Sequence, residues 1–148
     1  MADVYGVDVT TQTINDMRHR FVDPIYAGDE AVVPMAANAV IAAEQFVCAN
    51  ASGYAVAGAD TSGYKFLGIA MEAKDNTGGA NGAKLIRIRR RGCFLMAASS
   101  IAQSNVGSVM EIVNATTFDD TSTNHVKCGK LIKYVSATAG WIAINEGF

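Results

Sequence analysis

Short runs of alternating apolar and polar residues, separated by turns rich in glycine and asparagine, occupy the chain from about residue 39 onward. Alternation with a period of two is typical of strands that bury one face. The pattern predicts strands at residues 45–49, 54–58, 64–72, 84–96, 108–114, 127–137 and 140–147. Gly92 would break or bulge the fourth of these strands. Regularly spaced short strands predict an all-β fold, built as a small β-barrel or sandwich.

The segments between these strands follow other patterns. Residues 36–45 are rich in alanine, which favours a helix. Residues 74–83 and 115–125 are rich in small polar residues and glycine and are typical of loops. Residues 97–107 form a connection, for which we expect one helical turn closed by Gly107.

The N-terminal region has neither a helical nor a strand period. We therefore divide the chain into an extended N-terminal arm, residues 1–38, and a β-barrel core domain, residues 39–148. The arm's few large apolar side chains lie among polar residues, and a turn is expected at Pro24. We predict that the arm binds a partner through Phe21, Pro24, Ile25 and Tyr26.

Charge divides the chain in a different way. Charged residues make up 18% of the 148 residues, below the average of about 25% for soluble domains. The net charge is −2, which argues against a protein that coats nucleic acid. Residues 1–60 contain eight acidic and two basic residues, a net −6, and the remainder contains six acidic and ten basic residues, a net +4. The two parts can therefore attract each other, within one chain or between chains.

Five of the 12 lysines and arginines lie in "KLIRIRRRGCF", residues 84–94. In a strand, one face would carry Leu85, Arg87, Arg89 and Arg91, and the other would be mostly apolar. The arginine face is compatible with solvent, with nucleic acid, or with an acidic protein surface on another subunit or on the arm. Aromatic residues that stack on bases are missing from this stretch, which disfavours nucleic acid. Since arginine pairs well with carboxylates, we predict an acidic partner for Arg87, Arg89 and Arg91.

The sequence contains no recognisable set of catalytic or metal-binding residues. Its two histidines, His19 and His125, have neither metal-ligand spacing nor an evident nucleophile beside them. Three cysteines, Cys48, Cys93 and Cys128, are too far apart for a zinc motif and are expected to be small buried residues in a reducing cytoplasm. No apolar run reaches the about 18 residues of a membrane span. We therefore expect no enzyme activity, cofactor, metal, small-molecule substrate or membrane contact.

The order of strands and glycines over residues 40–146 resembles that of the capsid cement, or head decoration, proteins of tailed bacteriophages. The segments that carry this resemblance are "QFVCANASGYAVAGADTSGYKFLGIAME", "RRRGCFLM", "VGSVMEIV" and "KCGKLIKYVSATAGWIAI". Two positions depart from the family pattern. Glu44 stands where a turn glycine is common, and Ala57-Gly58 replaces a strand end that usually contains proline.

The resemblance implies a small β-barrel or β-tulip that binds the outer surface of a mature phage head. It implies two partners, the major capsid protein and further copies of this chain in a homotrimer. The protein would be made in the host cytoplasm and would cement neighbouring capsid subunits against the pressure of packaged DNA. A nucleic-acid-binding small β-barrel, a head fibre base and a tail component remain as alternatives.

Overall fold

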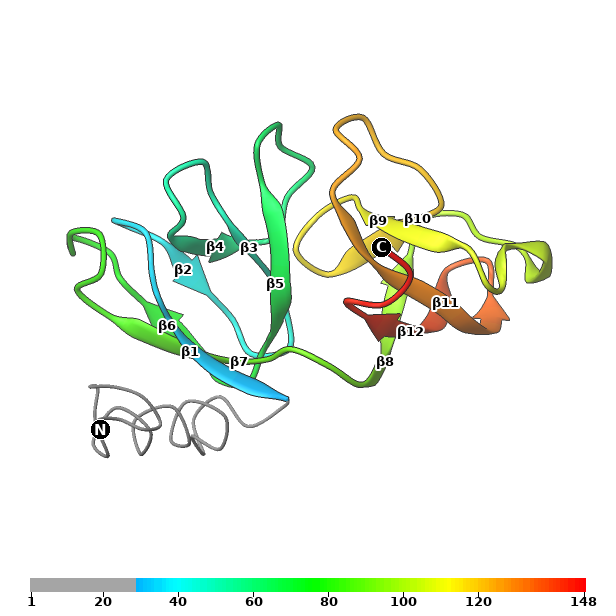
Figure 1. Cartoon of the computed structure of the whole chain (residues 1–148), viewed down its shortest axis with the longest axis horizontal. Coiled ribbons are helices and arrows are strands. Elements are labelled where there is room, and N and C mark those ends of the chain that lie inside the picture. Colours follow the sequence, from blue (N-terminus) through cyan, green and yellow to red (C-terminus); the bar gives the residue numbers. More distant parts are fainter. Residues whose placement is uncertain (1–28) are drawn as a thin grey trace, which may run out of the picture.

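The computed structural model describes residues 29–148, which form two packed lobes of β-strands (Figure 1). Within these residues the one helical element is the short 3-10 turn η1 (Gln103–Asn105). The prediction of an all-β protein with a small barrel is therefore confirmed. Residues 1–28, which include Phe21, Pro24, Ile25 and Tyr26, lie outside the described part of the chain.

The first lobe, here called the sheet lobe, contains β1 to β7. Five of its strands form one sheet in the order β1-β7-β5-β3-β4, and the remaining two, β2 and β6, pair with each other. The strands are β1 (Glu30–Pro34), β2 (Val40–Ile41), β3 (Phe46–Ala49), β4 (Ala55–Ala57), β5 (Lys65–Ala70), β6 (Lys74–Asp75) and β7 (Leu85–Arg89). A parallel bridge between Met35 and Ala55 joins the end of β1 to β4. The sheet thus curves around its own apolar core, which includes Ile41, Ile86 and Ile88.

The second lobe, the barrel lobe, contains β8 to β12. Its strands are β8 (Cys93–Ala98), β9 (Val109–Ile112), β10 (Thr117–Asp119), β11 (Lys127–Ser136) and β12 (Ala139–Ile144). They form a closed barrel in the order β10-β8-β12-β11-β9, in which only the β8–β10 pair is parallel. Closure removes the unpaired edges that would otherwise attract other strands.

Strand β3 joins the two lobes because it is buried on both faces. Val47 packs into the core of the sheet lobe, whereas Phe46 and Cys48 point the other way, into the core of the barrel lobe. The Phe46 ring meets the Phe66 ring of β5 edge-on at 5.8 Å between centroids. Such edge-to-face pairs add to the stabilisation that burial itself provides. Strand β3 therefore contributes side chains to two neighbouring apolar cores.

Two polar contacts also connect the lobes. The Asp60 carboxylate, in the sheet lobe, accepts hydrogen bonds from the backbone N–H groups of Thr123 and Asn124, at 2.9 and 2.8 Å. Asn145, which follows β12, donates from Nδ2 to the carbonyl oxygens of Leu67 and Arg90, at 3.0 and 2.8 Å. Apolar packing and paired polar groups together hold the lobes in one arrangement.

Several predicted element boundaries differ from the structure. Residues 30–34 of the predicted arm form β1 and pair with β7, so the proposed boundary at residue 38 falls after the first strand of the sheet. The alanine-rich residues 36–45 contain the two-residue strand β2 and turns instead of a helix, because tertiary contacts outweigh alanine's propensity. The predicted loops 74–83 and 115–125 contain the short strands β6 and β10.

The long strand predicted at residues 84–96 is two strands, one in each lobe. β7 ends at Arg89 and β8 begins at Cys93, with the connection between the lobes in between. Gly92 has a φ of +126°, a conformation that other residues rarely adopt. The break predicted at Gly92 is therefore confirmed, and it marks the passage from the sheet lobe to the barrel lobe.

Candidate partner-binding surfaces

The arginine-bearing face of β7 lies on the outside of the sheet lobe. Ile86 and Ile88 are buried, whereas Leu85 and Arg87 are exposed, so the alternation predicted for this strand is confirmed. Strand β1 covers one edge of β7 in antiparallel register, and Val32 lies opposite Arg87. The outer face of these two strands, here called the β1–β7 face, combines apolar and charged side chains.

Arg89 contacts two acidic side chains at the N-terminal end of the described chain. Its guanidinium nitrogens lie 3.8 Å from Asp29 Oδ2 and 3.6 Å from Glu30 Oε2. The arginine side chain is 36% exposed, so each pair contributes at most about 1 kcal/mol. The structure thus supplies acidic contacts for Arg89 from Asp29 and Glu30 of its own chain, within the region assigned to the arm.

Arg87 and Arg91 have other surroundings. Arg87 is exposed, and its backbone N–H donates to Glu72 Oε2 at 3.0 Å. Arg91 follows the end of β7 and lines a shallow hollow together with Phe66 and Asn145. The prediction that three arginines share one strand face therefore holds for Arg87 and Arg89 only.

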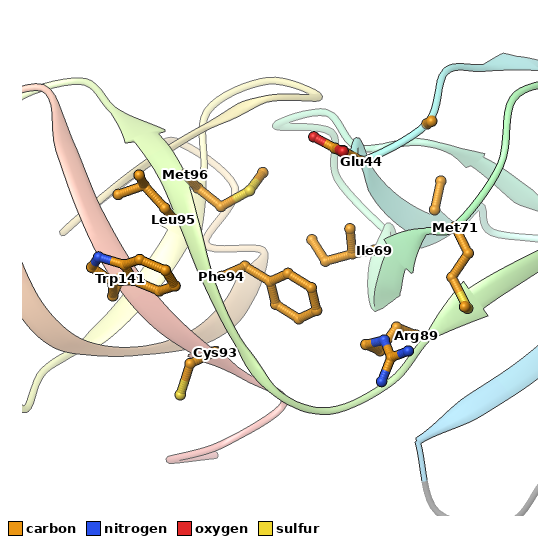
Figure 2. A pocket seen from close by; sticks show the side chains of 11 residues that line it. Glu44, Ile69, Met71, Arg89, Cys93, Phe94, Leu95, Met96 and Trp141 are labelled. Atoms are coloured by element: carbon orange, nitrogen blue, oxygen red, sulfur yellow. The ribbon is translucent and has the colours of Figure 1, made fainter.

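A groove of about 480 Å³ separates the sheet lobe from the barrel lobe on one side of the molecule (Figure 2). Ile69 and Met71 line it from the sheet lobe, and Phe94, Leu95 and Trp141 line it from the barrel lobe. Leu95 and Trp141 are directly opposite each other on β8 and β12, and they are 52% and 37% exposed. The groove is within the size range of about 300–1,000 Å³ that is usual for binding clefts, and its walls are mostly apolar.

The charged residues of the groove lie at its two ends. Glu44 stands at one end and Arg89 at the other (Figure 2). Glu44 has a φ of +69°, and its backbone N–H donates to the Ala70 carbonyl at 2.8 Å. Glycine adopts this left-handed conformation without strain, whereas other residues do so at a cost.

The thiols and the described histidine do not assemble into a reactive centre. Cys48 and Cys128 are buried, as predicted, but Cys93 is exposed, because it lies on the outer face of β8. Burial raises the pKa of Cys48 to about 12 and also raises the pKa of Cys128, so neither thiol readily ionises. Within residues 29–148, no group of three or more His, Cys, Asp and Glu side chains is placed to hold a metal ion.

His125 instead belongs to a hydrogen-bonded loop. Its Nδ1 lies 3.1 Å from Oε1 of Glu111, a carboxylate that is almost fully buried. The same oxygen accepts hydrogen bonds from the backbone N–H of Ser122, at 2.6 Å, and from the Ser122 hydroxyl. These partners satisfy a carboxylate that would be costly to bury alone. The contact orders the loop before β11.

The groove was not identified from the sequence, although one signal for it is present. In β8, "CFLMAA", apolar residues occupy both faces of the strand. Met96 and Ala98 point into the barrel, whereas Cys93, Leu95 and Ala97 are exposed. An outer strand face without polar residues indicates contact with something other than water.

Comparisons of this chain with models of protein families, with curated proteins and with solved structures find no match. Among the described residues, no helix has the length and apolar character required to cross a membrane.

Proposed function

We propose that the protein is a structural virion protein that binds the outer surface of a tailed-phage head and cements neighbouring major capsid subunits. The observation that carries this proposal is the fold. The glycine-punctuated segments that resemble head decoration proteins are the strands and turns of an all-β molecule with a closed barrel. The left-handed turn at Glu44, where the family pattern has glycine, adds support.

The proposed mechanism separates two surfaces. Copies of the chain associate into a homotrimer through the β1–β7 face, where exposed Arg87 contributes charge and Leu85, 51% exposed, contributes apolar area. The arm then binds the major capsid protein, with Phe21, Pro24, Ile25 and Tyr26 as contact residues. Because a trimer carries three arms, weak individual contacts add up to firm attachment.

The arm hypothesis is tested by replacing its large side chains. The triple variant Phe21→Ala, Ile25→Ala, Tyr26→Ala should reduce the number of copies bound per head and lower the temperature at which full heads rupture. Tyr5→Ala is the matched control, since it removes an arm aromatic outside the contact group. Undiminished occupancy of heads by the triple variant would contradict the proposed role of the arm.

Nucleic-acid binding is the alternative that the exposed Arg87 and Arg91 side chains favour. Two observations weigh against it: Arg89 is already paired with Asp29 and Glu30, and the net charge is −2. A gel-shift titration with duplex and single-stranded DNA at physiological salt discriminates between the two proposals. Submicromolar binding that weakens steeply with salt would favour the alternative.

A further inference from the structure

The groove between the lobes has the features of a site for an extended, apolar protein segment. Its walls carry aliphatic and aromatic side chains from both lobes, and its charges are confined to the ends (Figure 2). Leu95 and Trp141 leave a large apolar area uncovered in the described part of the chain. Exposed apolar surface of this kind usually marks a contact with another segment or protein.

The start of the described chain lies at the rim of this groove. The Asp29 carbonyl accepts a hydrogen bond from the backbone N–H of Arg90, and its carboxylate is 3.8 Å from Arg89. Arg89 itself lines the groove. The residues that precede Asp29 are therefore attached to the molecule at the Arg89 end of the groove.

The sequence before Asp29 has a suitable composition. "FVDPIY", residues 21–26, places four large apolar side chains on a short stretch, and the residue before Pro24 is biased toward an extended conformation. Tyr26 is three residues from Asp29, a span of at most roughly 10 Å, and Phe21 is eight residues away, at most roughly 28 Å. Both can reach the groove of their own chain.

We propose that residues 21–26 bind in the groove of their own chain, which they enter beside Arg89. A second copy could offer the same segment, but the three-residue connection to Asp29 gives the chain's own segment a high effective concentration. The inference concerns the free protein and does not depend on binding to a capsid. If the same side chains also bind a capsid, the groove and the capsid compete for them.

Disulfide trapping in the full-length protein tests the proposal. Cys93 is an exposed thiol that lines the groove, whereas Cys48 and Cys128 are buried. A cysteine introduced by Ile25→Cys or Tyr26→Cys should form a bond with Cys93 under mild oxidation, at least about tenfold faster than one introduced by Tyr5→Cys. The products are resolved by non-reducing electrophoresis and peptide mapping.

Each outcome of the trapping experiment either supports or contradicts binding of residues 21–26 in the groove. Rapid bonds within one chain support the proposal, and bonds mainly between two chains would overturn it in favour of a second copy. Rates equal to that of Tyr5→Cys in both variants would overturn it altogether.

A second readout uses the chain's single tryptophan, Trp141, which lines the groove. Tyr26→Asp should uncover Trp141, shift its emission to longer wavelength and raise the acrylamide quenching constant about twofold, whereas Tyr5→Asp should leave both unchanged. Identical spectra and quenching for the two variants would contradict occupancy of the groove by this segment.

Discussion

The sheet lobe and the barrel lobe bury similar side chains but present different chemistry to the solvent. On the outer face of β7, Arg87 and Arg89 stand beside the acidic start of β1. On the outer face of β8, which three residues separate from the end of β7, Leu95 is exposed beside Trp141 of β12. On their inner faces both lobes bury apolar side chains, which include Ile86 and Ile88 in the sheet lobe and Met96 and Ala98 in the barrel lobe.

This difference separates what stabilises the molecule from what it binds. The apolar cores of both lobes include side chains of β3, so we expect the two lobes to unfold together. The outer faces contribute little to folding, and we propose a different partner for each. The proposed partner of the charged β1–β7 face is another subunit, and that of the apolar wall of the groove is the arm.

The largest effect is expected from Phe46→Ala, which removes the side chain that extends from β3 into the barrel core. Phe46 is fully buried and packs against Phe66, so the free energy of unfolding should fall by about 3–5 kcal/mol. Urea denaturation followed by circular dichroism and by Trp141 fluorescence measures this loss. Phe148→Ala, at a 57% exposed position, should change stability by less than about 0.5 kcal/mol.

The same experiment tests whether the two lobes unfold as one unit. If the two lobes share one core, both signals should report a single transition in the wild type and in the variant. Separate transitions, with only one sensitive to Phe46→Ala, would mean that the lobes are independent domains.

A smaller effect is expected from the polar contact at Asn145. Asn145→Ala removes two hydrogen bonds between the lobes and places alanine at a φ of +55°. The expected loss is about 2 kcal/mol, of which about 1 kcal/mol comes from the backbone conformation. Asn145→Gly keeps the conformation accessible and should lose only the remaining part. Equal losses in thermal denaturation of the two variants would refute this division.

The second polar contact predicts how stability depends on pH. Desolvation opposes ionisation of Asp60, but hydrogen bonds from Asn124, Thr123 and Ser122 outweigh it and lower the pKa of Asp60 below 3.8. A carboxyl with a lowered pKa in the folded state stabilises the protein above its unfolded pKa, and this contribution is lost as the pH falls through the folded pKa. Between pH 5 and pH 3 the melting temperature of Asp60→Asn should therefore fall less than that of the wild type.

Asp75→Asn provides the comparison for this pH dependence. Hydrogen bonds from Thr77 also lower the pKa of Asp75, but this contact lies within the sheet lobe. Asp75→Asn should therefore flatten the profile of melting temperature against pH in the same direction as Asp60→Asn, because the effect follows from the lowered pKa and not from which lobes the contact joins. A profile as steep as that of the wild type in either variant would show that the corresponding carboxylate does not stabilise the folded state.

The smallest effects on stability are expected on the outer faces, where the effects on association should differ. Arg87→Glu and Leu95→Glu replace exposed side chains and should each change the free energy of unfolding by about 0.5 kcal/mol or less. If the proposed trimer forms through the β1–β7 face, Arg87→Glu should shift it toward monomers in sedimentation velocity, whereas Leu95→Glu should not. Unchanged sedimentation of Arg87→Glu would exclude the β1–β7 face as the subunit interface.

The sequence correctly predicted the structural features that depend on a local pattern of residues. Alternation in residues 85–89 correctly separated Ile86 and Ile88 from Arg87 and Arg89, because burial of one strand face imposes a period of two. The glycine at residue 92 correctly indicated a break, since its positive φ is disfavoured for other residues. These features depend on residues that are close in sequence.

The sequence did not predict the features that depend on contacts between segments far apart in the chain. Strand β1 lacks a clear pattern of its own and forms because β7 supplies its hydrogen-bonding partner. The division into two lobes depends on β3 being buried on both faces, and "FVCA" is too short to show this. The groove exists only after β5 and β8 lie beside each other, so Glu44 and Arg89 at its ends could not be paired in advance.

The central claim is that this protein covers the outside of a phage head, and its abundance on purified heads tests that claim most directly. Full, DNA-containing heads should be isolated by density gradient and analysed by quantitative mass spectrometry and electron microscopy. The account predicts a copy number close to that of the major capsid protein, with density for the protein on the outer surface at positions of local threefold symmetry. Absence from full heads, or a few copies confined to the tail, would contradict it.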